Sequence, residues 1–348
     1  MVPAKRYRVD LVSSRSDSAG LPARVLVVRL GAIGDVVNAL VFATALKRAR
    51  PDTHVGWAIH DLALPLVEGH PSVDRVHLWR RGSGGAGRRA VTRELRAERY
   101  DLAVDLQRIA KSALLARASG APRVLGYDRR RAKEFSWLLA TERIAPGPPH
   151  EHMVDQYLAF ARHLGCDGPA EHLLPVDAEA DAWAAALVDE LGAAPVLINP
   201  GASKPRNRWS PECFGALAKR LVEDGAAPVV AIGGPGDREL ATALLAAAGP
   251  GVRDLVGATT LPRLIALERR ARLVVTGDTG PMHLAVAVGT PTLALFGPAD
   301  PRRTGPYGST ERTDSRHTVL RATEGRMDAL AVETVHAAAR AKLANERA

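Results

Sequence analysis

The chain has 348 residues, of which 46% are hydrophobic and 24% charged, as in a globular protein large enough for two domains. Aromatic residues make up only 4%, which argues against platforms for base stacking, and Cys166 and Cys213 have no metal-ligand spacing. The net charge of +9 favours anionic partners: nucleotides, phosphorylated glycolipids, an anionic membrane or nucleic acid. The alternative is that the arginines form solvated surfaces and have no anionic partner.

Residues 1–23 lack both hydrophobic periodicity and an apolar run, and we predict a mobile leader there rather than a signal peptide. No apolar run elsewhere reaches the length of a membrane span. We therefore expect a cytoplasmic protein, whose contact with a membrane would be peripheral and from the cytoplasmic side.

The first half of the chain alternates short apolar runs with helical segments, which predicts a parallel sheet covered by helices on both faces. The predicted strands are residues 24–30, 54–59, 73–78, 101–105 and 123–127. The predicted helices are residues 36–50, 88–99, 107–117 and 150–164.

A second series of the same kind follows a linker at residues 165–179 that is rich in Gly, Pro and Asp. Its predicted strands are residues 195–199, 229–232, 273–275 and 292–296, and a tail helix is expected at 327–346. The pattern predicts two Rossmann-like, doubly wound α/β domains, at 24–170 and 180–320, that face a central cleft. Ligands of such sheets bind outside the carboxyl ends of the strands.

The stretch from Thr276 to Ala285 reads as the end of a buried strand and the start of a helix. Asp278 or Thr279 can act as the N-cap, and Pro281 suits the first helical turn. The N-terminus of a helix attracts anions, phosphate above all, and His283 can add a donor. An ordinary strand-to-helix turn with polar caps is the alternative.

Three strand ends of the second half carry loops in which glycine lets the backbone approach a ligand. They are Asn199–Ser203, Gly233–Asp237 and Asp278–His283. Positive charge beside the first loop comes from Lys204, Arg206 and Arg208. Because these ends lie at one edge of the predicted sheet, we expect a site for a nucleotide diphosphate and its sugar.

The loop from Gly31 to Asp35 is neither the glycine fingerprint of dinucleotide-binding proteins nor a P-loop. Asp61, after the second strand, keeps a dehydrogenase as a minor alternative. Asp35 is either an N-cap or a general base toward a hydroxyl group, a role that requires a carboxylate within hydrogen-bonding reach. No clustered metal ligands are visible in the sequence, so metal dependence is not indicated.

These motifs resemble those of the bacterial heptosyltransferases of lipopolysaccharide inner-core synthesis, glycosyltransferase family 9. The resemblance extends from Arg24 to Gly308. It is carried by Arg29–Val36, Asp105–Gln107, Lys111–Ala113, Asn199–Ala202, Arg208–Pro211 and Gly277–His283.

The resemblance implies a GT-B fold with the tail helix packed back on the first domain. It implies inverting, metal-independent transfer from ADP-L-glycero-D-manno-heptose to the anionic Kdo–lipid A or Kdo/heptose core at the inner membrane, by a protein we expect to be a monomer. Asp35 matches the catalytic aspartate, and no nucleic acid is expected as a partner. The donor-binding candidates are Ser203, Lys204, Arg206, Arg208, Asp237, Asp278, Thr279, Gly280, Pro281 and His283. The acceptor-binding candidates are Gly34, Lys111, Arg131 and Lys133.

One position departs from the family pattern, because Asn207 stands where a Lys-x-Trp-Pro motif has its lysine, and Ser210 is inserted before Pro211. Arg208, Arg206 and Lys204 are the candidates for the missing charge. Two other functions stay open: a family relative with another nucleotide sugar or a soluble acceptor, and a non-catalytic binder of polyanions.

Overall fold

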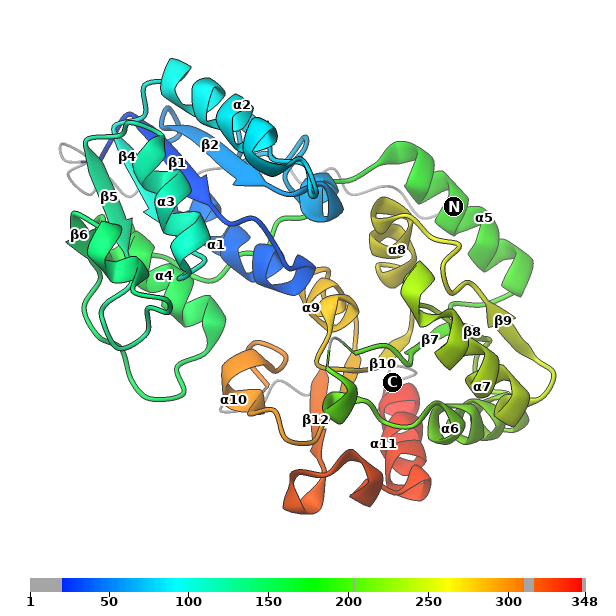
Figure 1. The fold of residues 1–348 in the computed structure, drawn as a ribbon. Coiled ribbons are helices and arrows are strands. Elements are labelled where there is room, and N and C mark those ends of the chain that lie inside the picture. The colour runs from blue at the N-terminus through cyan, green and yellow to red at the C-terminus, as the bar shows by residue number, and fades with distance from the viewer. Residues whose placement is uncertain (1–20, 203, 310–315, 346–348) are drawn as a thin grey trace.

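Short runs of branched apolar residues form two parallel sheets in the computed structural model, which describes residues 21–202, 204–309 and 316–345 (Figure 1). The first sheet has the order β3-β2-β1-β4-β5-β6. Its strands are β1 (Arg24–Val28), β2 (His54–Ile59), β3 (Arg75–Leu78), β4 (Leu102–Asp105), β5 (Arg123–Gly126) and β6 (Glu142–Arg143).

The second sheet has the order β12-β11-β10-β7-β8-β9. Its strands are β7 (Val196–Asn199), β8 (Val229–Ala231), β9 (Val252–Asp254), β10 (Leu273–Gly277), β11 (Thr292–Phe296) and β12 (His317–Arg321). Counted from its own first strand, each sheet has the order 3-2-1-4-5-6, which is that of the Rossmann fold. The strand order reverses between β1 and β4 in the first sheet and between β7 and β10 in the second.

The helices of the first domain are α1 (Ile33–Ala49), α2 (Gly84–Ala97), α3 (Ala110–Ala118) and α4 (Met153–His163). Helix α1 is buried along almost its whole length, from Val36 to Leu46. A helix that is apolar all round must be covered on every side. Here α1 is covered by its own sheet, by α4 and by α9 of the second domain.

The helices of the second domain are α5 (Ala178–Leu191), α6 (Pro211–Glu223), α7 (Arg238–Ala248), α8 (Leu261–Glu268), α9 (Gly280–Ala287), α10 (Pro301–Thr304) and α11 (Val332–Asn345). Short 3-10 turns are η1 (Asp61–Leu66), η2 (Ser136–Leu139), η3 (Pro205–Asn207), η4 (Pro235–Asp237), η5 (Thr323–Gly325) and η6 (Met327–Ala329). The chain passes from the first domain to the second between α4 and α5.

The prediction that the tail helix packs back on the first domain is wrong. Helix α11 packs on α6 and β10, and Figure 1 shows it in red beside α6. Val335, Ala339 and Leu343 recur every fourth residue and are buried in the same apolar cluster as Trp209. The Trp209 Nε1 group also donates to the Leu330 carbonyl over 2.9 Å. The tail therefore completes the core of its own domain.

The two domains touch through polar contacts as well as through α1 and α9. His152 Nε2 lies 2.9 Å from the carbonyl oxygen of Gly305, and the Tyr307 hydroxyl donates to Asp155 over 2.8 Å. Within residues 21–202, 204–309 and 316–345, none of the helices combines the length and apolarity required to cross a bilayer.

Candidate active site

The loop after β1 places a carboxylate where the strand order of the first sheet reverses. Asp35 is the third residue of α1, whose N-cap position is taken by Ala32, so Asp35 is not the N-cap. Its carboxylate is paired with the Arg29 guanidinium, which is buried and also donates to the Leu106 carbonyl over 3.1 Å. The Asp35 side chain stays 40% exposed, so it is held from one side and accessible from the other.

The end of β4 supports this loop. Gln107 Oε1 accepts a hydrogen bond of 2.7 Å from the Leu30 backbone N–H, which ties the two central strand ends together. Asp105 is buried beside them and accepts a hydrogen bond of 2.9 Å from the Gln107 N–H. Burial raises the pKa of Asp105 to about 6. These contacts give the Asp105–Gln107 motif a positioning role.

In the second sheet, uncharged polar side chains surround the point between β7 and β10 where the strand order reverses. The buried Asn199 amide donates to the hydroxyls of Thr276 and Thr279 over 3.0 and 3.1 Å. Thr279, one of the two predicted N-cap residues, occupies the N-cap position of α9, and Pro281 lies in the first turn. The Thr279 hydroxyl does not cap the helix in the described structure, since it bonds to Asn199 and Thr276 instead. The first turn of α9 is therefore free to receive an anion.

Asp237 packs against the loop after β7. Its Oδ2 accepts a hydrogen bond of 2.9 Å from the Gly234 N–H. A Cβ atom on Gly201 would lie 2.8 Å from Asp237 Oδ1, so the glycine is required for this approach. Two of the three glycine-rich loops are thus in direct contact, as their place at one sheet edge predicts.

The two domains meet at the first turns of α1 and α9. A Cβ atom on Gly34 would lie only 2.2 Å from the His283 ring carbon Cδ2. The Asn38 amide nitrogen is 3.3 Å from His283 Nδ1, which makes Nδ1 the acceptor and leaves the ring proton on Nε2. Burial lowers the pKa of His283 to about 4, so this histidine is neutral at pH 7. Predicted residues of the two sites, Gly34 and His283, are therefore in contact.

A second carboxylate faces Asp35 from the other domain. Asp278 accepts a hydrogen bond of 3.1 Å from the Thr304 hydroxyl and lies 3.9 Å from His283 Nε2. Burial raises the pKa of Asp278 to about 6, and the negative charge of Asp35 acts in the same direction. Two carboxylates from two domains therefore share one electrostatic environment.

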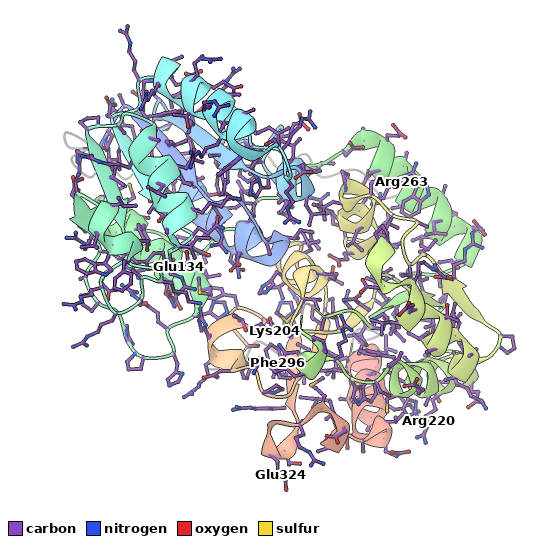
Figure 2. All side chains as sticks on the ribbon, in the orientation of Figure 1. Glu134, Lys204, Arg220, Arg263, Phe296 and Glu324 are labelled. Carbon is purple, nitrogen blue, oxygen red and sulfur yellow. The ribbon has the colours of Figure 1, made fainter. Side chains whose placement is uncertain are left out.

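Cations from both domains surround this pair. The positive charge of Arg108 lowers the pKa of Lys133, and burial, Arg303 and Lys204 act in the same direction, whereas Asp35 opposes them. Figure 2 shows Lys204 on the side of the second domain that faces the first. Of the three candidates for the charge missing at Asn207, Lys204 is the one whose charge reaches both Lys133 and Asp278. Arg108 and Arg303 were not predicted.

Several residues that were predicted to bind substrate make other contacts in the structure or lie apart from the two carboxylates. Arg131 is paired with Asp128 and with Glu151, the latter over 2.7 Å, so its charge is used within the first domain. Arg208 donates to the Ala202 carbonyl over 3.1 Å and holds the loop. Arg206 is exposed on η3. Ser203 lies outside the described residues.

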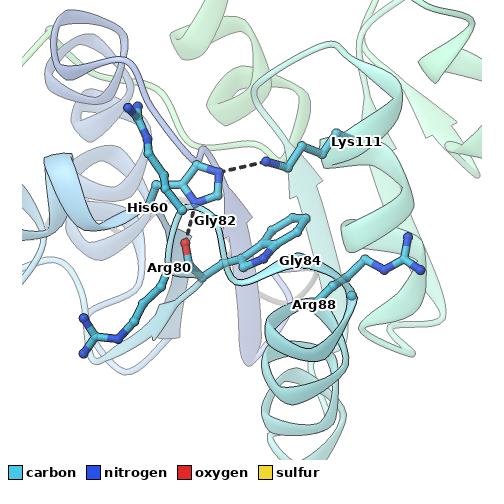
Figure 3. Close-up of a pocket in the computed structure, with 9 residues that line it drawn as sticks. His60, Arg80, Gly82, Gly84, Arg88 and Lys111 are labelled. Atoms are coloured by element: carbon cyan, nitrogen blue, oxygen red, sulfur yellow. Dashed lines mark hydrogen bonds between the residues drawn. The ribbon is translucent and has the colours of Figure 1, made fainter.

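Lys111 lines a cationic pocket of about 540 Å³ in the first domain (Figure 3). Its ammonium group donates to His60 Nε2 over 3.0 Å and lies 4.3 Å from the centre of the Trp79 ring. Burial lowers the pKa of Lys111, and Arg81 acts in the same direction. The lining residues are His60, Trp79, Arg80, Arg81, Gly82, Gly84, Gly85, Arg88 and Lys111. This pocket adjoins the loop before α1, because a Cβ atom on Gly31 would lie 3.9 Å from the Arg81 guanidinium.

In the part of the chain that the structure describes, no cluster of three or more His, Cys, Asp or Glu side chains has the arrangement of a metal site. Two Rossmann-like domains whose carboxyl-edge loops meet are the architecture of GT-B glycosyltransferases. The contact between the Asp35 loop and the Asp278 loop is therefore where a transfer reaction would be placed.

The family model for glycosyltransferase family 9 (heptosyltransferase) matches residues 88–328. Lipopolysaccharide heptosyltransferase 1 of Pseudomonas aeruginosa is 32% identical over 307 residues, which cover 83% of this chain and 82% of that protein. The lipopolysaccharide core heptosyltransferase OpsX of Haemophilus influenzae is 25% identical over 84% of both chains. The chain belongs to glycosyltransferase family 9 and is a glycosyltransferase.

Solved structures agree with this assignment. The E. coli ADP-heptose lps heptosyltransferase II has a TM-score of 0.79 and 25% identity, with 93% of this chain and 100% of that chain covered. The E. coli heptosyltransferase WaaC with ADP-2-deoxy-2-fluoro heptose has a TM-score of 0.71 and 25% identity, with 93% and 100% covered. A family 9 protein from Veillonella parvula, 23% identical with a TM-score of 0.82 over 93% and 97% of the chains, shares the fold.

Proposed function

We propose that the protein transfers a heptose from ADP-L-glycero-D-manno-heptose to the Kdo-containing inner core of lipopolysaccharide, with inversion at the anomeric carbon and without a metal. The observation that carries the proposal is the meeting of Asp35 with Asp278 and His283 among cations from both domains. The names of the relatives support the acceptor class, and the bound ADP-sugar analogue of one relative supports the donor.

In the proposed reaction, Asp35 is the general base. The acceptor hydroxyl gives its proton to the Asp35 carboxylate while its oxygen attacks the anomeric carbon from the face opposite the diphosphate. The bond between that carbon and the diphosphate oxygen breaks, and ADP leaves. The ion pair with Arg29 orients the carboxylate, and its 40% exposure leaves room for the incoming hydroxyl.

The departing diphosphate gains negative charge, which the second domain is arranged to stabilise. The first turn of α9, from Gly280, offers backbone N–H groups and the positive end of the helix dipole. Lys204 and Arg303 add positive charge beside it. Asp278 and Thr304 are placed to hold hydroxyl groups of the transferred sugar.

The acceptor would bind from the first domain. The pocket around Lys111 is lined by four cationic side chains, which fits the carboxylate and phosphate groups of Kdo–lipid A. Lys133 continues this positive surface toward Asp35. Because both halves of the site come from one chain, a monomer is sufficient for the reaction.

Binding of ADP, UDP, GDP and NAD, measured by calorimetry without added metal, tests the donor. We expect selectivity for ADP, and then turnover of ADP-heptose with a Kdo-containing acceptor. Selectivity for UDP or GDP would overturn the donor but not the fold. That result would favour a relative with another nucleotide sugar, for which Asn207 in place of lysine is the motivating observation. Binding of none of the four would overturn the proposal.

A further inference from the structure

Exposed apolar side chains are concentrated on one part of the first domain. Among the described residues, the large hydrophobic side chains that are exposed are Leu62, Leu114, Phe135, Leu138 and Val176. Leu114 lies in α3, and Phe135 and Leu138 are the N-cap and a residue of η2, which packs on α3. Phe135 is 75% exposed, Leu138 61% and Leu114 49%. Because η2 packs on α3, we refer to these three side chains together as the apolar patch.

The backbone fixes Phe135 in this exposed position. Glu134 and Phe135 have φ angles of +51° and +56°, in the left-handed region that costs a residue with a side chain about 1–2 kcal/mol. Glu134 also accepts a hydrogen bond of 3.1 Å from the Ala110 N–H at the start of α3. The Lys133 N–H and the Ser136 hydroxyl both donate to the Arg108 carbonyl, over 2.8 and 2.9 Å. Hydrogen bonds on both sides thus maintain a strained turn with an aromatic side chain in solvent.

Cations border the apolar patch. The guanidinium groups of Arg129 and Arg143 lie 5.2 and 5.6 Å from the centre of the Trp137 ring. On the other side, a groove of about 470 Å³ runs between α2 and α3, which are neighbours in Figure 1. Its lining residues are Arg88, Arg89, Thr92, Arg93, Arg96, Leu114, Leu115 and Ala118.

The excess of positive charge in the protein is concentrated in three segments of the first domain. Residues 80–99 contain seven arginines and two glutamates, and residues 110–118 contain two basic residues and no acidic one. Residues 128–143 contain five basic and three acidic residues. The three excesses, five, two and two, equal the net charge of +9, so the rest of the chain is neutral on balance.

We propose that the face formed by α2, α3 and η2 docks on an anionic bilayer. Phe135, Leu138 and Leu114 enter the interfacial layer, and the surrounding arginines contact headgroup phosphates. This inference rests on the proposed function, because docking would give the enzyme access to a lipid-anchored acceptor. Arg88 lines both the groove and the Lys111 pocket, so docking brings that pocket to the bilayer surface. Exposed leucines distinguish this face from a surface for nucleic acid, which uses stacking and phosphate contacts.

Co-sedimentation with vesicles tests the docking without donor or acceptor. The vesicles contain phosphatidylcholine with about one-third phosphatidylglycerol, and vesicles of phosphatidylcholine alone serve as the neutral comparison. The double variant Phe135→Ser/Leu138→Ser is expected to bind the anionic vesicles about tenfold or more weakly, because two apolar side chains no longer leave water. Val176→Ser, a change at an equally exposed position on the interdomain linker, is expected to bind like the wild type.

A second pair of variants separates charge at this face from charge in general. Arg89→Gln/Arg93→Gln removes two positive charges from α2 and is expected to weaken vesicle binding by about tenfold to thirtyfold at low salt. Lys219→Gln/Arg253→Gln removes the same charge from the second domain and is expected to change binding less than about twofold. Unchanged thermal unfolding of each variant shows that its fold is intact.

Each remaining result overturns one of the two proposals. If the Phe135→Ser/Leu138→Ser variant binds anionic vesicles as tightly as the wild type, the docking proposal is overturned. The proposal is also overturned if the protein binds heparin as tightly as vesicles and only the arginine substitutions weaken the binding. That second result would identify a general polyanion-binding surface. Turnover of a water-soluble, delipidated Kdo acceptor is measured in parallel. Turnover without vesicle binding overturns only the docking, and vesicle binding without turnover overturns only the proposed function.

Discussion

The two domains share one strand order but differ in the chemistry at the point where that order reverses. In the first domain this point carries charge: the Arg29–Asp35 pair and the buried Asp105. In the second domain, Asn199 and two threonine hydroxyls form an uncharged network beneath the open first turn of α9. In the proposed mechanism, one backbone scaffold supplies a proton acceptor on one side and a binding site for a diphosphate on the other. The following predictions test this division of roles.

Asp35→Asn is expected to have the largest effect, a loss of about 10²–10⁴-fold in kcat, because the amide cannot accept the acceptor's proton. ADP affinity is expected to stay within about twofold, since the donor is assigned to the other domain. Turnover and calorimetry measure the two quantities. Asp189→Asn, an exposed change on α5, is the control, and full activity of Asp35→Asn contradicts the assignment.

Gly34→Ala tests the contact through which the domains meet. The added methyl group would lie 2.2 Å from the His283 ring, so we expect a loss of about 1–3 kcal/mol in the free energy of unfolding and reduced turnover. Chemical denaturation and steady-state kinetics are the measurements. Gly236→Ala is the matched control, because nothing lies within 4 Å of the added atom. If the contact is as described, adding His283→Ala relieves the clash, and the two substitutions are not additive.

Asn199→Ala removes the amide that donates to the Thr276 and Thr279 hydroxyls. We expect ADP to bind about fivefold to thirtyfold more weakly, because one or two buried hydrogen bonds that shape the start of α9 are lost. Gln107→Ala is the equivalent change in the first domain and is expected to leave ADP affinity unchanged while lowering turnover. Equal effects of both variants on ADP binding would contradict the division of roles.

The last prediction concerns the dependence of stability on pH. Asp105 and Asp278 have folded-state pKa values raised to about 6, above the ordinary carboxyl value of about 3.9. The native state therefore binds more protons than the unfolded state, and the stability from each protonated carboxyl, complete below about pH 4, is lost as the pH rises through 6.

Asp105→Asn and Asp278→Asn remove this dependence. Each variant is expected to gain stability relative to the wild type as the pH rises from about 4 to about 6, by on the order of 2 kcal/mol. Chemical denaturation at a series of pH values measures the difference. A difference that is constant over this range would show that folding does not raise the pKa of the carboxyl.

The parts of the site that lie in compact motifs were predictable from the sequence. Strand-to-helix turns place Asp35 and Asp278 at sheet edges, and the fold brings both together with His283 and Lys204. Arg108 stands alone in the loop before α3, and Arg303 lies in the four-residue helix α10. Both were missed because only the tertiary structure brings their charges to Lys133.

Arg131 was assigned to the acceptor because it lies in a run of cations, but pairing with Asp128 and Glu151 cannot be read from spacing. Helix α5 was missed because its alanine-rich sequence follows a segment that reads as linker. Strand β9 was missed because it has only three residues, of which Arg253 and Asp254 are charged. The tail helix was placed on the wrong domain because an apolar stripe indicates that a helix packs, and not which surface it packs on.

The contact between Gly34 and His283 also places the two carboxylates beside one packed interface, because Asp35 directly follows Gly34 and Asp278 lies 3.9 Å from His283 Nε2. Any rotation of one domain about this point moves nearby atoms little and distant atoms much. A rotation about this contact would therefore change the separation of Asp35 from Asp278 less than it changes distances farther from the contact.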